Sequence, residues 1–193
     1  MIVRTKIDDS TLYQNEKFTK AVNKMFKEVE KTYENTNETF GKALSTSYQS
    51  EQPQHIIELD GFDGLYEEIL HQIKRAAPEF GMVTHKKELQ ITRMWMNRIW
   101  KGASAATHFH GLRPDEGVGI FYVDVPEGNS SDLVVIYSGE AGLAIEEYQP
   151  EELQYMNVKT GDLILHDMML PHAVSQHNNR KPRTALIFEY RFV

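Results

Sequence analysis

The sharpest local feature of the sequence is a pair of histidines, His108 and His110, separated by one residue. In a strand, residues two apart point to the same face, so the two imidazoles can bind one metal ion. Taken alone, such a pair also fits two surface histidines beside a glycine-rich loop. A third histidine, His172, follows 64 residues after His108, just beyond the apolar run Gly161–Leu165. This layout predicts that His108, His110 and His172 are catalytic metal ligands.

The ligand set of this site has to be built from nitrogen and oxygen, because the chain has no cysteine. An iron site that activates oxygen needs three protein ligands on one face, with the other positions open for substrates. The third ligand is usually a carboxylate, yet His110 stands in the slot two residues after the first histidine. Three carboxylates, Asp115, Glu116 and Asp167, therefore remain as alternatives to His110.

A β-rich second half is expected to position these histidines. From Leu89 onward, short runs of Val, Ile, Tyr, Phe and Trp alternate with Gly, Pro, Asn and Asp, which is typical of a sandwich or barrel. The predicted strands are Leu89–Trp100, Val118–Val125, Leu133–Tyr137, Leu143–Glu147, Leu153–Val158, Asp162–His166, His172–Gln176 and Thr184–Phe192. His166 is expected on a strand beside the metal site, and His177 in a solvated turn.

The first part of the chain reads as helical. Apolar residues recur at steps of three and four from Phe18 to Tyr33 and again from Asp63 to Ala77, where Pro78 ends the second helix. We expect these helices to cover one sheet. The whole chain of 193 residues fits one domain, with a helical support region over 1–85 and a β core over 86–193.

Composition excludes several classes of function. The formal net charge of −7 argues against nucleic acid as a partner, because such binding relies on clustered Lys and Arg. No apolar stretch approaches the roughly 20 residues of a membrane span. The first residues lack the apolar core of a signal peptide, so a cytoplasmic location is expected.

Several motifs together resemble the 2-oxoglutarate/Fe(II)-dependent oxygenase superfamily, above all its prolyl-hydroxylase-like branch. The chain also resembles a group of uncharacterised bacterial and phage members, which carry a Trp-x-Asn stretch upstream of His-x-His. The resemblance covers residues 89–193 well and the N-terminal part loosely. It is carried by Trp95–Asn97, Gly102, His108-x-His110, Gly119–Val123, Gly161–Leu165, Pro171–Val174 and Arg183–Phe188.

The resemblance implies a fold, cofactors and residue roles. The fold would be a double-stranded β-helix, or jelly roll, and the cofactors Fe(II), 2-oxoglutarate and O2. Arg183, eleven residues after His172, matches the arginine that pairs with the distal carboxylate of 2-oxoglutarate. Tyr122 matches a tyrosine that bonds the same carboxylate, and Asn97 is expected to face the pocket. The implied activity is hydroxylation of an unidentified substrate with release of succinate and CO2.

Two other classes of function remain open at this stage. A cupin would share the jelly roll and the metal without 2-oxoglutarate; Gly102 and His108-x-His110 fit the start of its first motif, but Glu116 lies one residue late. A non-enzymatic interaction protein would bind no metal at all. For an oxygenase, the expected partners are a small-molecule or protein side-chain substrate and no membrane, and the long first helix could pair with a second copy in a homodimer.

Overall fold

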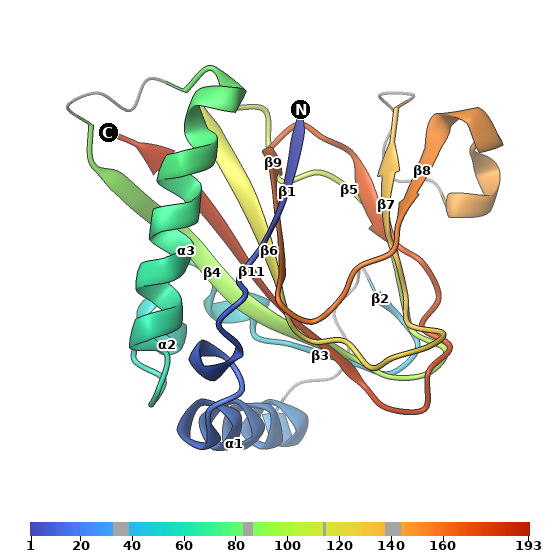
Figure 1. Cartoon of the computed structure of the whole chain (residues 1–193). Helices are drawn as coiled ribbons and strands as arrows, with labels where there is room; N and C mark the ends of the chain where they lie inside the picture. The colour runs from blue at the N-terminus through green and yellow to red at the C-terminus, as the bar shows by residue number, and fades with distance from the viewer. Residues whose placement is uncertain (33–38, 83–86, 114, 138–143) are drawn as a thin grey trace.

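The β-strands of the chain form two antiparallel sheets that face each other (Figure 1). The computed structural model describes residues 1–32, 39–82, 87–113, 115–137 and 144–193. One sheet has the order β1-β9-β6-β11-β4-β3 and the other β2-β5-β10-β7-β8. The strands are β1 (Ile2–Lys6), β2 (Thr39–Phe40), β3 (Ala43–Ser45), β4 (Leu89–Ile99), β5 (Ser104–His108), β6 (Glu116–Asp124), β7 (Leu133–Ile136), β8 (Leu153–Met156), β9 (Asp162–Asp167), β10 (His172–Val174) and β11 (Arg183–Phe192).

Most of the predicted strands are present, but the expected strand at Leu143–Glu147 is wrong. Leu143 lies outside the described residues, and Ile145–Glu147 forms a 3-10 helix. In this turn the backbone N–H of Ala144 donates to the Glu147 carboxylate at 2.7 Å. A local side-chain bond of this kind offers the backbone a partner other than a neighbouring strand.

Alternate residues of the six-stranded sheet point to its two faces. On β11, Leu186 and Phe188 belong to the cluster that includes the helices, whereas Ala185 and Ile187 belong to the cluster that reaches β7 through Leu133. This is the two-residue period of a strand buried on both sides. The inner face, between the sheets, therefore receives the odd-numbered residues of β11, which include Arg183 and Glu189.

Three α-helices lie in the first part of the chain: α1 (Glu16–Thr32), α2 (Gln54–Ile57) and α3 (Asp63–Ala76). Figure 1 shows α3 running across the outer face of the sheet near β4, with α1 at one end of the molecule. The predicted apolar faces are buried there, with Val22 and Ile69 in the same cluster as Phe188. Tyr33, the last residue of the predicted first helix, lies outside the described residues. No helix in the described part of the chain is long and apolar enough to cross a membrane.

The 3-10 helices are short connections around these elements. The second of them follows β3 in the stretch 34–54, for which the sequence predicts no element, and its C-cap residue is Ser50. The Ser50 carbonyl accepts a hydrogen bond from the backbone N–H of Met94 on β4 at 2.9 Å. The 3-10 segments are Ser10–Leu12, Ser47–Gln49, Ala77–Phe80, Ile145–Glu147 and Pro150–Glu152.

Candidate active site

The three predicted ligand histidines converge between the sheets. His108 ends β5 and pairs directly with His172 of β10 in the antiparallel register, and their ring centres lie 4.5 Å apart. His110 lies beyond the end of β5, and its ring stacks on that of His172 at 5.2 Å. One nitrogen of each ring lies within 4.8 Å of the others. Cross-strand pairing therefore joins histidines that are 64 residues apart.

Each of the three rings is oriented by a hydrogen bond at Nδ1. His108 Nδ1 lies 2.8 Å from the carbonyl oxygen of Ala106, and His172 Nδ1 lies 3.0 Å from that of Leu170. A carbonyl oxygen only accepts, so both Nδ1 atoms carry a proton in the neutral ring and leave the lone pair on Nε2. The same pattern is typical of histidines that bind a metal through Nε2.

The surroundings of the His172 ring favour its neutral form. Burial, followed by the charges of the neighbouring histidines, holds the pKa of His172 well below its ordinary value. A neutral imidazole is the form that binds a metal. The Nε2 atom of His110 is buried with no hydrogen-bond partner among the described residues.

A divalent metal of the first transition row fits these donors. Bonds of about 2.1 Å to three nitrogens place those nitrogens about 3 to 4 Å apart, so only a small side-chain adjustment is needed. Three imidazole nitrogens suit iron, copper, nickel or zinc. The orphaned His110 Nε2 gains a partner when such an ion binds.

The alternative carboxylates have other partners in the structure. Glu116 is buried on β6 and forms an ion pair of 2.8 Å with Arg113. Asp167 accepts hydrogen bonds from the N-terminal ammonium group and from the backbone N–H of Met169. Asp115 lies exposed in a turn. Among the described residues, the cluster able to hold a metal consists of His108, His110 and His172.

The predicted cosubstrate residues line the same cavity, which has a volume of about 650 Å³. Arg183 starts β11 and is 4% exposed; its Nη1 donates to Ser131 Oγ at 2.5 Å, and its Cζ lies 4.7 Å from the ring centre of Tyr122. Burial lowers the pKa of Arg183 and raises that of Tyr122, but guanidinium stays charged at neutral pH and the phenol stays protonated. Asn97 faces the cavity from β4, and its buried Oδ1 has no hydrogen-bond partner within the described ranges of the chain.

Two further buried residues, Glu189 and His166, lie next to the three histidines. Glu189 of β11 was not considered, yet its Oε1 lies 3.0 Å from His110 Nδ1. The two-residue period that runs inward from Arg183 could have found it. His166 of β9 was expected beside the site; its ring is fully buried with its centre 4.8 Å from that of His172.

The expectation that His177 is a solvated turn residue is wrong. It is fully buried, with Nδ1 accepting from the backbone N–H of Ser131 at 3.2 Å and Nε2 donating to the carbonyl of Lys181 at 2.8 Å. His177 therefore connects Lys181 to the loop that carries Ser131, and the Ser131 side chain in turn contacts Arg183. Its polar neighbours in the sequence gave no sign that the chain would fold back over it.

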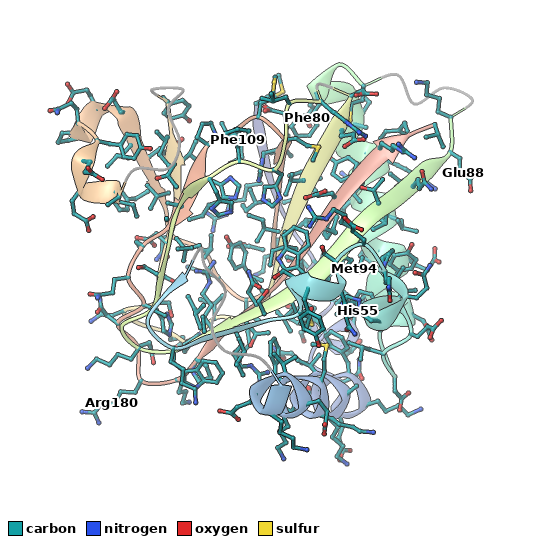
Figure 2. The ribbon with its side chains drawn as sticks, turned by 180° about the vertical axis from the view of Figure 1, so that it is seen from behind. His55, Phe80, Glu88, Met94, Phe109 and Arg180 are labelled. Carbon is teal, nitrogen blue, oxygen red and sulfur yellow. The ribbon has the colours of Figure 1, made fainter. Side chains whose placement is uncertain are left out.

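Phe109 and Tyr48 line the cavity, and both are about half exposed. Figure 2 shows Phe109 at the upper end of the molecule, far from the labelled Arg180 at the lower end. Phe109 stands between His108 and His110 in the chain, so this exposed part of the cavity wall lies beside the histidines.

Comparisons with known proteins bear on this site. No curated protein sequence matches the chain. The crystal structures of HygX from Streptomyces hygroscopicus, one with nickel and 2-oxoglutarate bound and one with iron bound, superimpose with TM-scores of 0.59 and 0.61 at 11% identity. These matches cover 98% of this chain and 82% and 81% of those chains.

Two further solved structures differ in how well they match. A Pseudomonas putida prolyl-4-hydroxylase gives a TM-score of 0.57 at 14% identity, covering 98% of this chain and 91% of that one. An oxidoreductase of the 2OG-Fe(II) oxygenase family from Burkholderia pseudomallei is 20% identical, but this chain spans only 56% of its length over 65% of its own, with a TM-score of 0.47. The HygX and prolyl-4-hydroxylase matches, with the two antiparallel sheets, confirm the double-stranded β-helix.

The family comparison decides between the classes of function left open above. The family model described as "Putative 2OG-Fe(II) oxygenase" matches residues 93–189, which is half of the chain and includes all three histidines and Arg183. Neither a cupin without 2-oxoglutarate nor a non-enzymatic protein accounts for this match. The cofactors of the family are the predicted ones: Fe(II), 2-oxoglutarate and O2. The chain therefore belongs to the 2-oxoglutarate/Fe(II)-dependent oxygenases and is an enzyme of that family.

Proposed function

We propose that the enzyme is a hydroxylase in which His108, His110 and His172 hold Fe(II). In the proposed reaction, a C–H group of the substrate, 2-oxoglutarate and O2 give the hydroxylated substrate, succinate and CO2. One oxygen atom enters the new hydroxyl group and the other enters succinate. The bound iron would supply the redox centre at which O2 is reduced as 2-oxoglutarate loses CO2.

The observation that carries this proposal is a buried positive charge in the same cavity as the three imidazoles. Arg183 is 4% exposed, and none of the ion pairs found among the described residues involves it. A buried, unpaired guanidinium is costly, so a site that keeps one is suited to an anionic ligand. A dicarboxylate such as 2-oxoglutarate supplies that anion, and a cupin without it has no use for the charge.

The residues of the cavity have distinct proposed roles. Arg183 binds the distal carboxylate of 2-oxoglutarate through two parallel N–H bonds, which its planar fork allows. The Tyr122 hydroxyl and the Asn97 side chain hold the same cosubstrate. Ile120, Leu133 and Ile187 line the cavity with apolar surface and exclude water from the buried ion pair.

The substrate we propose is a small molecule or a protein side chain. The cavity of about 650 Å³ lies in the range of small-molecule sites, so it has room for a substrate beside 2-oxoglutarate. The net charge of −7 disfavours nucleic acid. A homodimer would pair through another surface of α1, because the apolar face of this helix packs within its own chain.

The experiment that tests this function measures 2-oxoglutarate binding and turnover. The purified protein, loaded with Fe(II), is mixed with 2-oxoglutarate and air, and the succinate formed is quantified with and without candidate substrates. We expect 2-oxoglutarate binding that depends on the metal, and succinate formation that is lost in His172→Ala. Glu116→Gln is the control, because this buried carboxylate pairs with Arg113 and not with a histidine.

Two results would count against the proposal. Metal-loaded protein that neither binds nor consumes 2-oxoglutarate contradicts it as a whole. Succinate formed without any oxidised product, across a broad panel of small molecules and peptides, contradicts the hydroxylase reaction but leaves cosubstrate binding intact.

A further inference from the structure

Glu189 is a buried carboxylate directly behind one of the proposed metal ligands. It lies on the inner face of β11 and is 3% exposed. Its Oε1 accepts a hydrogen bond from His110 Nδ1 at 3.0 Å, and the side chains of both residues are less than a tenth exposed. Burial of the pair makes this contact much stronger than an exposed one would be.

The carboxylate determines which nitrogen of His110 faces the other imidazoles. A carboxylate only accepts, so Nδ1 of the neutral ring is its donor and the lone pair lies on Nε2. That Nε2 is buried with no hydrogen-bond partner in the described part of the chain. The Nδ1 atoms of His108 and His172 bond to backbone carbonyls. The backbone N–H of His110 donates to the Met168 carbonyl at 3.0 Å, but the Nδ1 of its ring bonds to the Glu189 side chain. Glu189 therefore provides the orientation that the backbone does not.

Glu189 also supplies negative charge to a ligand set that contains no carboxylate. Three neutral imidazoles leave the full charge of a divalent cation uncompensated, whereas a carboxylate ligand would remove part of it. A buried carboxylate one imidazole away from the ion restores this negative charge from the outside. His110 stands where the usual ligand set has a carboxylate. Glu189 therefore contacts the one ligand whose charge differs from the usual set.

A second contact holds the carboxylate in place. Arg93 Nη1 lies 3.2 Å from the same Oε1, and Arg93 Nη2 donates to Ser50 Oγ at 2.7 Å. Ser50 follows the 3-10 helix Ser47–Gln49, and its carbonyl accepts a hydrogen bond from the backbone N–H of Met94 on β4. The contacts of Glu189, Arg93 and Ser50 therefore connect the site to the N-terminal part of the chain. Arg93 also neutralises Glu189 in part, but its side chain is 39% exposed, so its charge is screened by solvent.

We propose that Glu189 is a positioning residue: it orients His110 to present Nε2 to the metal and supplies the negative charge that the three-histidine ligand set lacks. This inference rests on the proposed function, because it takes His110 as a metal ligand. It assigns no contact between Glu189 and the substrate.

The test measures metal affinity with Co(II), which needs no turnover. Co(II) is titrated into metal-free wild-type protein, Glu189→Gln and Glu189→Ala, and binding is followed by visible absorption. We expect affinity to fall about 10- to 100-fold in both variants, which is the range found when partners of metal-bound histidines are removed. Glu116→Gln is the matched control: it removes a carboxylate of similar burial, two residues away in the strand register, that pairs with Arg113 and Arg191.

A spectroscopic readout separates positioning from general stability. In protein loaded with diamagnetic Zn(II), nuclear magnetic resonance reports the protonated nitrogen of each bound histidine. We expect the Nδ1–H signal of His110 to move or vanish in both Glu189 variants, with those of His108 and His172 unchanged. A fold that is merely weakened would disturb all three. Glu189→Asp, which keeps the charge, should recover part of the lost affinity.

The outcomes distinguish this inference from the proposed function. Wild-type protein that binds no Co(II) contradicts the three-histidine site itself. Wild type and Glu189→Gln that bind Co(II) equally well, with the same His110 signal, overturn the role of Glu189 and leave the site intact. If Glu189→Ala does not fold, Glu189→Gln and Glu189→Asp, which keep nearly the same shape, still decide.

Discussion

Arg183 is the residue whose removal separates cosubstrate binding from metal binding. Its guanidinium is held against Tyr122 and Ser131, and the charge is not shared with any carboxylate in the ion pairs of the described residues. Arg183→Met keeps the volume of the side chain and removes both charge and donors. We expect 2-oxoglutarate affinity to fall about 10- to 100-fold, since hydrogen bonds to charged groups contribute about 1.5–3 kcal/mol. Calorimetric titration of Co(II)-loaded protein measures this loss.

The control for Arg183 is Arg4→Met, which removes a cation paired with Asp162 at 2.6 Å on the edge strand β1. Its 2-oxoglutarate affinity should match that of the wild type. Co(II) affinity should be the same in all three proteins. If Arg183→Met binds 2-oxoglutarate as tightly as the wild type, the carboxylate is held elsewhere.

His166 makes the stability of the metal-free protein depend on pH. Burial is the largest cause that lowers its pKa from the ordinary 6.5 to about 4. Between about pH 6.5 and pH 4 the unfolded chain therefore binds more protons than the folded one, so the free energy of unfolding falls as pH falls through this window. His166→Gln should reduce the loss of stability between pH 7 and pH 5, measured by urea unfolding. An equal loss in both proteins would show that other groups cause it.

At the residue level, the sequence singled out six residues that the fold brings to one cavity, but not the residues that contact them from behind. Spacing and resemblance singled out His108, His110, His172, Arg183, Tyr122 and Asn97, and all six line one cavity. Glu189 and Ser131 were missed because each acts through a partner far away in the chain, and no local pattern marks such a contact. His177 was misread for the same reason: its burial depends on the loop at Ser131.

At the level of elements, the β6–β11 pair is the part of the scaffold least tolerant of added volume. Gly119 lies opposite Phe188, and a Cβ at this glycine would overlap the Phe188 ring, which is fully buried and has no room to move. We expect Gly119→Ala to destabilise the metal-free protein by about 1–3 kcal/mol, the usual effect of overpacking a core. The midpoint of urea unfolding measures this change.

Gly111→Ala serves as the comparison for Gly119. A Cβ at Gly111 would meet Met168 at an ordinary contact distance of 3.4 Å, so its unfolding midpoint should barely move. Equal effects in the two variants would mean that Phe188 can shift aside and that the pair is not tightly packed.

Strands with strong apolar runs were predictable, and several short strands without such a run were not. The long strands β4, β6 and β11 were predicted to within two residues at each end. In contrast, β1, β3 and β5 were missed because none of them carries a longer run of β-branched and aromatic residues, although β7, β8 and β10 are as short and were predicted. Pairing such as Ile2 with His166 comes from the tertiary fold, which a local period does not reveal.

At the level of the whole molecule, metal binding should stabilise the fold, because the ligands come from separate strands and meet only in the folded state. A Co(II) concentration of about 100 times the dissociation constant adds about 2.7 kcal/mol. For a chain of this size, that raises the melting temperature by roughly 5–11 °C. His108→Ala should lose the shift at the same Co(II) concentration, and His71→Ala, an exposed histidine on α3, should keep it. An equal shift in all three proteins would mean that Co(II) binds elsewhere.

The jelly roll and its covering helices were predictable as a whole, because the change from a helical to a strand-like apolar pattern near Leu89 is clear in the sequence. The order of strands in the two sheets was not, since it depends on pairings between distant segments. In particular, β1 and β3 extend the large sheet at its two edges and bring N-terminal residues beside the C-terminal core (Figure 1).

The most direct test of the account is a crystal structure of the protein with Co(II) and 2-oxoglutarate, in which anomalous scattering locates the metal. We predict one ion within about 2.0–2.3 Å of Nε2 of His108, His110 and His172, with the distal carboxylate of 2-oxoglutarate paired to Arg183. An ion bound at other residues, or 2-oxoglutarate bound away from Arg183, would contradict it.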